Sequence, residues 1–534
     1  MREYNVALKE GIDYDEFWND MESDTDGGKL YIPNRAVEFT NERPASLRQC
    51  WYLLTDEEAE TLRQDDRIYC VEIPPEQRTD IQIGRRAFQS EDFTKTTSDS
   101  GAYVNWGLIR TQNIDNNYGT GTTTTQRYTY TLTGNGVDVV IQDSGIQVDH
   151  PEFNDANGVS RVQQINWATV SGLGFTQNAN HYRDYDGHGT HVAGIVAGRH
   201  YGYAKNARIY SLKVNGLEGS GDTGTGIDVT YAFDAIKVWH NNKPIDSTTG
   251  AKRPTVVNMS WGYGQGYDTV SEVNYKGTSN TGTAIDTVGE REAFGLINNS
   301  GAPSNTYVAN IRVGSVDVDV EEMISAGIVV CIAAGNRGFK IEVSTGADYN
   351  NYAVTNTGTI YYHRGSSPYS PNAIIVGAID STTYDATYDQ KATYSETGPG
   401  VDLFAPGSNI MSSTSTTNSW GAGSQNYYYN SSYKQTNISG TSMAAPQVAG
   451  MVSLYLETSP KASPASIKSA IVENTSPAIY STGFYEDYTS RRSLMNVKRR
   501  VLFNKFASSG EIWAMSGPGL VVSANMNAFT GSLA

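Results

Sequence analysis

Short, almost uninterrupted runs of apolar and β-branched residues recur through the middle of the chain and constrain its fold more than any other feature. They occupy 136–143, 207–214, 254–260, 327–334 and 372–378, with helical spacing between them at 189–197, 226–238 and 320–326. Strands that are apolar along their whole length are typical of a parallel sheet covered by helices. We expect an α/β fold with a mostly parallel sheet and helices on both faces. Its chemistry should lie beyond the carboxyl ends of the strands.

The first hundred residues have a different pattern. Alternating segments predict the order βαββαβ, with strands near 4–8, 36–40, 49–54 and 67–73 and helices near 13–21 and 56–63. This order is typical of a small α+β, ferredoxin-like domain. The polar stretch 74–101 would link it to the rest of the chain. Without further information it could be an accessory or binding module.

Composition narrows the possible partners. The 534 residues carry a formal net charge of −17, which argues against nucleic acids and anionic membranes. No apolar run reaches membrane-spanning length. Cys50, Cys70 and Cys331 are too few for a disulfide framework, and no Cys/His spacing typical of a metal site occurs. The first ten residues lack the apolar core of a signal peptide. We therefore expect a cytoplasmic or virion-associated protein rather than one secreted by a classical signal.

One short stretch has the character of a catalytic loop. Residues 439–446, SGTSMAAP, place Ser442 between a Gly/Ser/Thr-rich loop and an apolar segment with helical spacing. The first amides of a helix lack internal acceptors, and the helix end carries partial positive charge. Ser442 could therefore supply a nucleophile and half of an oxyanion hole. The alternative is that Thr441 or Ser442 merely caps the helix.

Two further residues complete a possible acyl-transfer site. Asp143 ends the strand at 136–143, and His188 lies at a glycine-flanked helix start, DGHGTHVAG. A hydroxyl nucleophile needs an imidazole to take its proton and a carboxylate to orient that imidazole. Taken singly, Asp143 could belong to a turn and His188 could be structural. A zinc site shared by His188 and His191 is disfavoured, because no third ligand is near.

A second oxyanion donor is also present. Asn336 follows the apolar run 327–334 in the sequence AAGN, where it would lie beyond a strand end. A Gly-Asn pair by itself is typical of a turn. Near Ser442, however, the Asn336 amide would complete the oxyanion hole together with the serine N–H.

The four motifs around Asp143, His188, Asn336 and Ser442 together resemble the signatures of subtilisin-like serine proteases (subtilases), in family order. The resemblance covers roughly residues 103–480 and is nearest the proteinase K branch. It implies that no cofactor is needed for catalysis. The short turn between Gly198 and Gly202 implies that the long calcium-binding loop of classical subtilisins is missing. Structural calcium remains possible, since Asp380 resembles a family calcium ligand.

The resemblance also implies where an extended peptide would bind. Ser260, Trp261 and Gly262 resemble the segment that pairs with the substrate backbone and forms one wall of the S1 pocket. Ala334 and Gly335 resemble the other wall. Gly219, Ser220 and Gly221 resemble the edge strand on the S4 side, so that binding would occur by strand addition. Trp261 stands where the family usually has leucine, which should reshape S1 or S4.

The first hundred residues resemble the inhibitory propeptide of subtilases. Cleavage would fall between Pro74 and Trp106. We expect three parts: a propeptide domain with its linker at 1–100, a catalytic domain at 101–507, and a C-terminal tail of unknown role at 508–534. The catalytic domain departs from the family by insertions near 263–312 and 339–369, beside the expected cleft.

The hypothesis is a serine endopeptidase that acts on proteins or peptides and is made as a self-processing zymogen, with its own propeptide as a partner. The alternative is a scaffold that keeps the fold without turnover. All four catalytic positions are intact, which argues against the scaffold.

Overall fold

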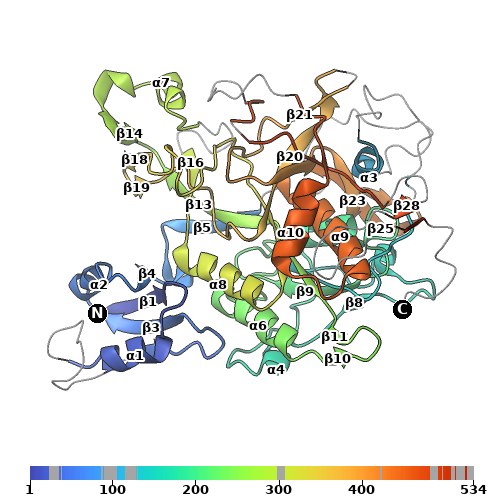
Figure 1. The fold of residues 1–534 in the computed structure, drawn as a ribbon, viewed down its shortest axis with the longest axis horizontal. Coiled ribbons are helices and arrows are strands. Elements are labelled where there is room, and N and C mark those ends of the chain that lie inside the picture. The colour runs from blue at the N-terminus through green and yellow to red at the C-terminus, as the bar shows by residue number, and fades with distance from the viewer. Residues whose placement is uncertain are drawn as a thin grey trace.

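The structure is a computed structural model of the whole chain (Figure 1). It describes residues 1–22, 35–85, 88–89, 105–114, 128, 130, 131–297, 307–480, 491–506, 511–512 and 524–525, apart from 38, 386, 421–423 and 496. The expected linker therefore lies partly outside the described residues, and so does most of the predicted tail. In the part of the chain that the structure describes, no helix is both long and apolar enough to cross a membrane.

A mostly parallel sheet forms the centre of the molecule, as predicted. Its strand order is β26-β27-β22-β20-β17-β12-β7-β9-β8, with β21 paired to β20. The strands from β8 to β27 along this path pair in parallel, and only β21 and β26 are antiparallel additions. The strands are β7 (Asp138–Asp143), β8 (Val162–Gln163), β9 (Arg208–Lys213), β12 (Thr255–Met259), β17 (Val329–Ala333), β20 (Ile374–Thr383), β21 (Asp389–Lys391), β22 (Leu403–Pro406), β26 (Thr475–Ser476) and β27 (Val501–Leu502).

Helices pack on this sheet and on each other. α9 lies across β12, β17 and β20 and contacts α5, whereas α6 and α8 pack together. A single large apolar core joins these helices to the sheet. The helices are α3 (Trp106–Thr111), α4 (Trp167–Ser171), α5 (His188–Ala197), α6 (Val229–Asn241), α8 (Gly314–Ser325), α9 (Thr441–Thr458) and α10 (Pro464–Glu473).

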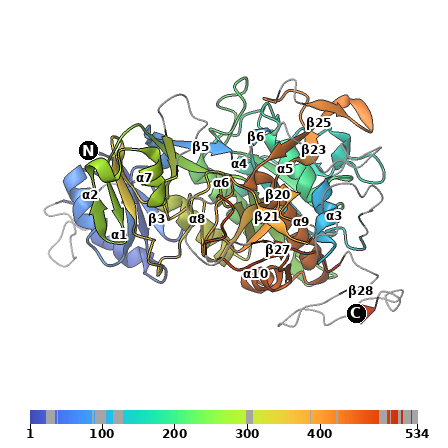
Figure 2. The same cartoon turned by 90° about the horizontal axis from the view of Figure 1, so that it is seen from above.

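The N-terminal region forms a small domain with its own core. Its elements are β1 (Arg2–Leu8), α1 (Tyr14–Glu22), β2 (Phe39–Asn41), β3 (Gln49–Leu54), α2 (Asp56–Leu62) and β4 (Ile68–Glu72). The antiparallel strand order β2-β3-β1-β4 and the βαββαβ element order agree with the predicted ferredoxin-like pattern. This domain lies to one side of the main body and meets it at α8 (Figures 1 and 2).

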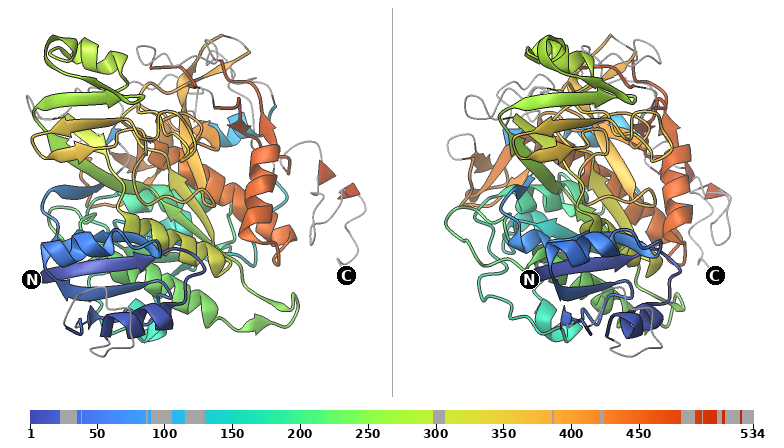
Figure 3. Two further views of the ribbon diagram at one scale, coloured as in Figure 1. Left: turned by 60° about the vertical axis from the view of Figure 1, so that its left-hand side comes forward. Right: turned by 90° about the vertical axis from the view of Figure 1, so that its left-hand side faces the viewer.

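Both predicted insertions contribute to one lobe. β14 from the first pairs with β18 from the second, in a sheet of order β15-β14-β18-β19. A neighbouring sheet has the order β16-β13-β5. The lobe rises on the same side of the molecule as the N-terminal domain (Figure 3). Its elements are β13 (Trp261–Tyr267), β14 (Val270–Tyr275), β15 (Thr278–Asn280), α7 (Val288–Ala293), β16 (Tyr307–Asn310), β18 (Tyr352–Thr355) and β19 (Gly358–Ile360).

The remaining strands belong to other small sheets, except β5, which is part of the sheet β16-β13-β5 described above. One further sheet has the order β23-β25-β24, with β6 paired to β25. These strands are β5 (Ile81–Arg85), β6 (Phe88–Gln89), β23 (Ile410–Thr414), β24 (Gln425–Tyr427) and β25 (Asn430–Ser439), with the two-stranded ribbons β10 (Ile245–Asp246)–β11 (Ala251–Lys252) and β28 (Glu511–Ile512)–β29 (Ala524–Asn525).

Candidate active site

The ends of β7 and α5 bring a carboxylate and an imidazole together. Asp143 is the last residue of β7 and His188 the first of α5. His188 Nδ1 lies 2.7 Å from Asp143 Oδ1, and both side chains are fully buried. Asp143 Oδ1 also accepts the N–H of Ser144, at 2.7 Å. A buried carboxylate at Nδ1 fixes the tautomer with its proton there, which leaves Nε2 able to accept a proton.

A second buried carboxylate organises both loops. Asp184 accepts hydrogen bonds from Ser144 Oγ at 2.9 Å, Gly187 N at 2.8 Å and Thr190 N at 2.9 Å. Ser144 Oγ in turn accepts the N–H of Gly189, at 2.8 Å. One side chain therefore ties the segment after Asp143 to both sides of His188. Sequence reasoning missed this residue, because an aspartate in a glycine-rich loop is typical of a turn.

Ser442 lies in the first turn of α9, as predicted. It is buried, and its Oγ donates to the carbonyl of Ser260 at 2.9 Å. Pro446, four residues later, has no N–H to donate back to the Ser442 carbonyl. Ser260 Oγ donates to that carbonyl instead, at 3.2 Å. The start of α9 is therefore fastened to the end of β12 by two reciprocal bonds.

Ser442 and His188, the predicted nucleophile and base, are not hydrogen-bonded to each other in this structure. No hydrogen bond joins Ser442 to His188 in the described part of the chain, and His188 Nε2 is buried without a partner there. Catalytic hydrogen bonds are often long or misaligned before substrate binds. A change in the Ser442 side-chain torsion, away from Ser260, would free Oγ for another acceptor.

Asn336 follows β17 and is held by the residue before Ser442. Its Oδ1 accepts the Thr441 N–H at 2.8 Å and the Thr441 hydroxyl at 2.9 Å, and Thr441 Oγ1 accepts the Gly335 N–H at 3.0 Å. The amide nitrogen of Asn336 has no hydrogen-bond partner among the described residues. The half-buried Asn336 side chain thus keeps a donor available beside the start of α9.

The predicted substrate segments are only partly strands. Trp261 and Gly262 begin β13 and pair antiparallel with Arg85 and Gly84 of β5. Trp261 is fully buried, with its ring against Phe233 and Tyr263. It therefore belongs to the core beneath the strand.

Gly219, Ser220 and Gly221 do not form the predicted edge strand. They lie in a turn, which the Asp222 N–H closes by bonding to the Gly219 carbonyl at 2.9 Å. The reason is Asp222 itself, whose carboxylate pairs with buried Lys213 at 2.5 Å and draws the chain inward. Ala334 and Gly335, by contrast, follow β17 directly beside Asn336, as expected.

One segment of the N-terminal region passes on both sides of Ser442. β5 pairs with β13 next to Ser260, and β6 pairs antiparallel with β25, Phe88 with Ser439 and Gln89 with Ile438. Between them only Arg86 and Ala87 lie outside the described residues. The sequence carried no clear signal for this arrangement, because strand addition depends on backbone groups and leaves little side-chain pattern.

The comparisons with known proteins agree with this geometry. A model of the subtilase family, peptidase family S8, matches residues 134–500. The chain belongs to the subtilase family. The matched residues include Asp143, His188, Asn336 and Ser442, and the predicted family is confirmed. As a subtilase, the chain is a subtilisin-like serine endopeptidase.

Two curated relatives and one solved structure are similar to this subtilase. An extracellular serine proteinase of Thermus sp. (strain Rt41A) is 29% identical over 443 residues, covering 82% of this chain and 72% of the relative. A cuticle-degrading serine protease of Arthrobotrys oligospora is 28% identical over 389 residues, covering 72% and 67%. The crystal structure of fervidolysin from Fervidobacterium pennivorans, a keratinolytic enzyme related to subtilisin, has a TM-score of 0.51 at 16% identity over 96% of this chain and 62% of that chain. At that identity it supports the fold alone.

The expected location is corrected by these relatives. A cytoplasmic or virion-associated protein was predicted from the character of the first ten residues. The similar subtilase from Thermus is named as extracellular, which contradicts that expectation. The prediction was wrong because it rested on the absence of an apolar stretch in ten residues, and such an absence does not determine the compartment.

The residues considered for metal binding have other partners. Asp380, the predicted calcium ligand of this subtilase, pairs through Oδ2 with Arg492 Nη1 at 3.0 Å. His191 Nε2 lies 3.0 Å from the Thr436 carbonyl, so His188 and His191 do not converge on a shared position. Burial lowers the pKa of His191 to about 3, which keeps its imidazole neutral.

Proposed function

We propose that this subtilase cleaves peptide bonds with Ser442 as nucleophile, His188 as general base and Asp143 as its orienting carboxylate. Ser442 Oγ turns from the Ser260 carbonyl toward His188 Nε2, gives up its proton and attacks the peptide carbon. Asp143 at Nδ1 stabilises the imidazolium that results. His188 then gives the proton to the leaving amine. In the second half of the reaction water attacks the acyl-enzyme, His188 again takes and returns a proton, and Ser442 is released.

The oxyanion would be bound by two donors. One is the Ser442 N–H at the positive end of α9, which has no internal helical acceptor. The other is the Asn336 amide nitrogen, whose carbonyl end is held by Thr441. Donors fixed in advance by the fold stabilise developing charge without reorganisation at the moment of reaction.

We further propose that the N-terminal domain is an inhibitory propeptide that this enzyme removes itself. The observation that carries the proposal is the passage of β5 and β6 on either side of Ser442. A peptide that pairs with β13 on one side and with β25 on the other presents the bond between these strands to the nucleophile. Cleavage would therefore fall between Arg85 and Phe88, within the range expected from sequence. After cleavage β5 still covers β13.

The contacts of the domain with α6 and α8 support this role. Glu76 accepts the Thr230 N–H at 2.8 Å, and Glu72 accepts the Ser315 N–H at 2.7 Å. Neither helix has a side-chain cap of its own. Carboxylates from the N-terminal region thus bond to amides at both helix starts that have no acceptor within their helix, and each contact contributes about 1 kcal/mol.

We propose proteins outside the cell as substrates. The similar subtilase of Thermus is named as extracellular, and that of Arthrobotrys oligospora as cuticle-degrading.

The test is the intact mass of the freshly purified chain beside its Ser442→Ala variant. We expect the wild type to separate into two fragments with a junction between Arg85 and Phe88, and the variant to remain whole. Labelling with a fluorophosphonate should modify Ser442 in the wild type alone. If both chains stay whole and unlabelled, the proposal is wrong and the scaffold alternative takes its place. If the wild type is labelled and cleaved elsewhere, the triad stands and the assigned bond is wrong.

A further inference from the structure

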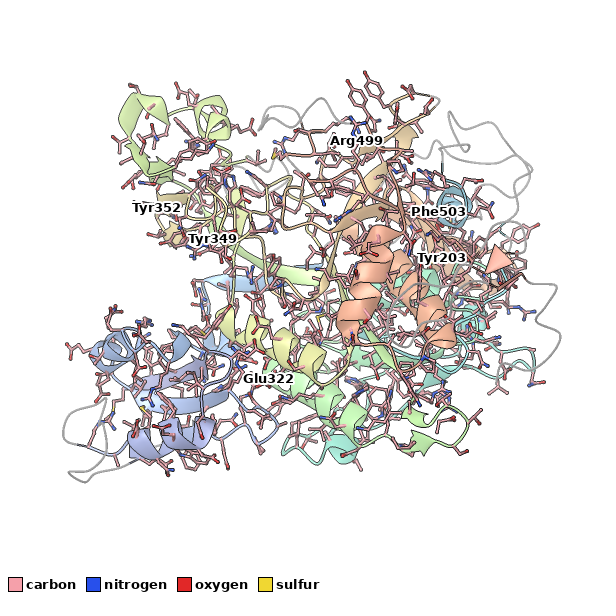
Figure 4. All side chains as sticks on the ribbon, in the orientation of Figure 1. Tyr203, Glu322, Tyr349, Tyr352, Arg499 and Phe503 are labelled. Carbon is pink, nitrogen blue, oxygen red and sulfur yellow. The ribbon has the colours of Figure 1, made fainter. Side chains whose placement is uncertain are left out.

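A buried cluster of charges lies where the N-terminal domain meets α6 and α8. Arg43, in the loop between β2 and β3, inserts its side chain between these two helices. We use the name Arg43 socket for the residues of α6 and α8 that receive it, Asp234, Lys237, Asp319 and Glu322. Glu322 is labelled on α8 in Figure 4, on the side that faces the N-terminal domain.

The guanidinium of Arg43 is bonded on every side. Its Nη2 lies 2.8 Å from Asp319 Oδ1 and 3.1 Å from Asp234 Oδ2, and donates to the Thr230 carbonyl at 3.2 Å. Its Nη1 donates to Gln49 Oε1 at 2.6 Å. The side chain of Arg43 is 1% exposed, and those of Asp234 and Asp319 are 3% and 2% exposed. This is an ion pair taken fully out of water between two parts of the chain.

Neighbouring bonds complete the contact. Glu322 Oε1 accepts the Ser46 hydroxyl at 2.9 Å and the Leu47 N–H at 3.0 Å, and its other oxygen pairs with Lys237. Gln49 Nε2 donates to Asp319 Oδ1 at 2.9 Å. In this cluster the residues from Arg43 to Gln49 supply the donors, and α6 and α8 supply the acceptors.

The backbone of Arg43 is also unusual. Its φ is +47°, in the left-handed region that a residue with a Cβ seldom adopts. Such a conformation persists only where surrounding contacts outweigh its cost. Here the contacts are those of the Arg43 socket. The strained backbone therefore indicates that these contacts fix the position of the Arg43 side chain.

Arg43 lowers the charge imbalance of the socket from a formal −2 to −1. The socket holds three carboxylates and one ammonium group, with Lys237 Nζ 3.4 Å from Asp234 Oδ1. A domain that docked here without a cation would bury acids that lack a counter-charge. Removing one partner of a buried, hydrogen-bonded ion pair is strongly unfavourable, whereas rim pairs matter little. The socket thus favours partners that present an arginine at this point.

We propose that the Arg43 socket is the recognition site by which the enzyme body selects its own N-terminal domain and retains it after the connecting chain is cut. The occupant is the N-terminal domain of this same chain together with the segment that follows it as far as Glu76. The helix caps at Glu72 and Glu76 would add affinity without selectivity, because any acidic side chain could cap a helix. Arg43 would add the selectivity. This inference deepens the proposed propeptide role and is tested without relying on self-cleavage.

The experiment uses the full chain with Ser442→Ala, and a recognition sequence for an added protease placed within 90–99. After cutting, the dissociation constant of the two fragments is measured by interferometry and checked by gel filtration. The test variant is Arg43→Met, which keeps length and removes charge. The matched control is Arg48→Met, since Arg48 pairs with Glu321 at the rim of the same interface, 13% and 24% exposed.

We expect Arg43→Met to weaken retention about 100-fold or more and Arg48→Met less than about fivefold. Asp319→Asn should recover about tenfold of the loss when combined with Arg43→Met, because it removes an uncompensated acid in the other fragment. A folding defect of the N-terminal domain would not be rescued from α8. Equal effects of Arg43→Met and Arg48→Met, or no rescue, would overturn the proposal. A chain that never cuts itself would leave this result intact and refute only the propeptide role.

Discussion

Asn336 accepts the backbone N–H of Thr441, the residue immediately before Ser442, at 2.8 Å. The Thr441 hydroxyl donates to the same oxygen and accepts the Gly335 N–H, so that the end of β17 and the start of α9 form one closed hydrogen-bonded unit. The proposed oxyanion donor and the proposed nucleophile are therefore held by a single residue. Their separation does not depend on loops far from either.

Replacing Asn336 by Ala should lower kcat about 100- to 1000-fold and leave KM nearly unchanged, as is typical for the loss of one oxyanion-hole donor. The measurement is hydrolysis of a chromogenic peptide by the processed enzyme. Asn504→Ala, a buried asparagine near the end of the described chain, serves as a control for general destabilisation. A loss below about tenfold would exclude Asn336 from the oxyanion hole.

Asp184→Asn should reduce kcat about 10- to 100-fold with little change in KM. The carboxylate would no longer accept from both Ser144 Oγ and the helix amides, so the Asp143–His188 pair would lose its alignment, and small displacements at a reacting centre are costly. The control is Asp155→Asn, because Asp155 also accepts two backbone N–H groups but in a loop of its own. A positioning role is contradicted if both variants lose stability and kcat alike.

Acid should destabilise the fold through its buried neutral histidines. Burial lowers the pKa of His191 to about 3, and the pKa values of His181 and His240 to about 4. Unfolded chains bind these protons near pH 6.5, so stability is complete above that pH and falls as the pH drops toward 4. His191 alone should lower the free energy of unfolding by about 3 kcal/mol at pH 4.5 relative to pH 7.

Denaturant unfolding of the Ser442→Ala chain between pH 7 and 4.5 measures this effect. His191→Gln should flatten the pH dependence by about one proton, whatever its effect on stability at pH 7. An unchanged slope would show that His191 does not titrate on unfolding.

Arg492→Ala should make thermal stability sensitive to calcium. The guanidinium of Arg492 pairs with the Asp380 carboxylate, which is 19% exposed, so the deletion should lower Tm by a few degrees at most. Calcium could then neutralise the freed carboxylate and restore part of the loss. The double variant Arg492→Ala/Asp380→Asn should not respond. If the wild type, the Arg492→Ala variant and the double variant respond equally to calcium, the ion binds elsewhere.

Much of the fold follows from the sequence because its signals are local. Uniformly apolar runs specify buried parallel strands, and β7, β9, β12, β17 and β20 lie within a few residues of the predicted ranges. The sequence also singled out Asp143, His188, Asn336 and Ser442, since each belongs to a motif with glycine at a strand or helix end, but it missed Asp184. Their clustering follows from the parallel sheet, which brings strand ends to one edge.

What the sequence could not supply depends on distant contacts. The turn at Gly219 forms because Asp222 reaches Lys213, and no local pattern distinguishes this turn from an extended edge. The role of Arg43 depends on Asp234 and Asp319, which lie 191 and 276 positions later in the sequence. The pairing of β6 with β25 uses backbone groups alone. In each case the partner is chosen by the tertiary structure.

The pairing of β14 with β18 makes the two predicted insertions depend on each other for their stability. Each supplies hydrogen-bonding groups for the other, and Val273 and Ala353 meet across the pair and are fully buried. Loss of either insertion alone would expose an unsatisfied strand edge with apolar side chains, the kind of surface that recruits other chains into aggregates. A lineage that gained or lost this lobe would have had to pass through such a state or change both segments at once. Shortened relatives should therefore lack both insertions, or carry prolines and charges where one remains.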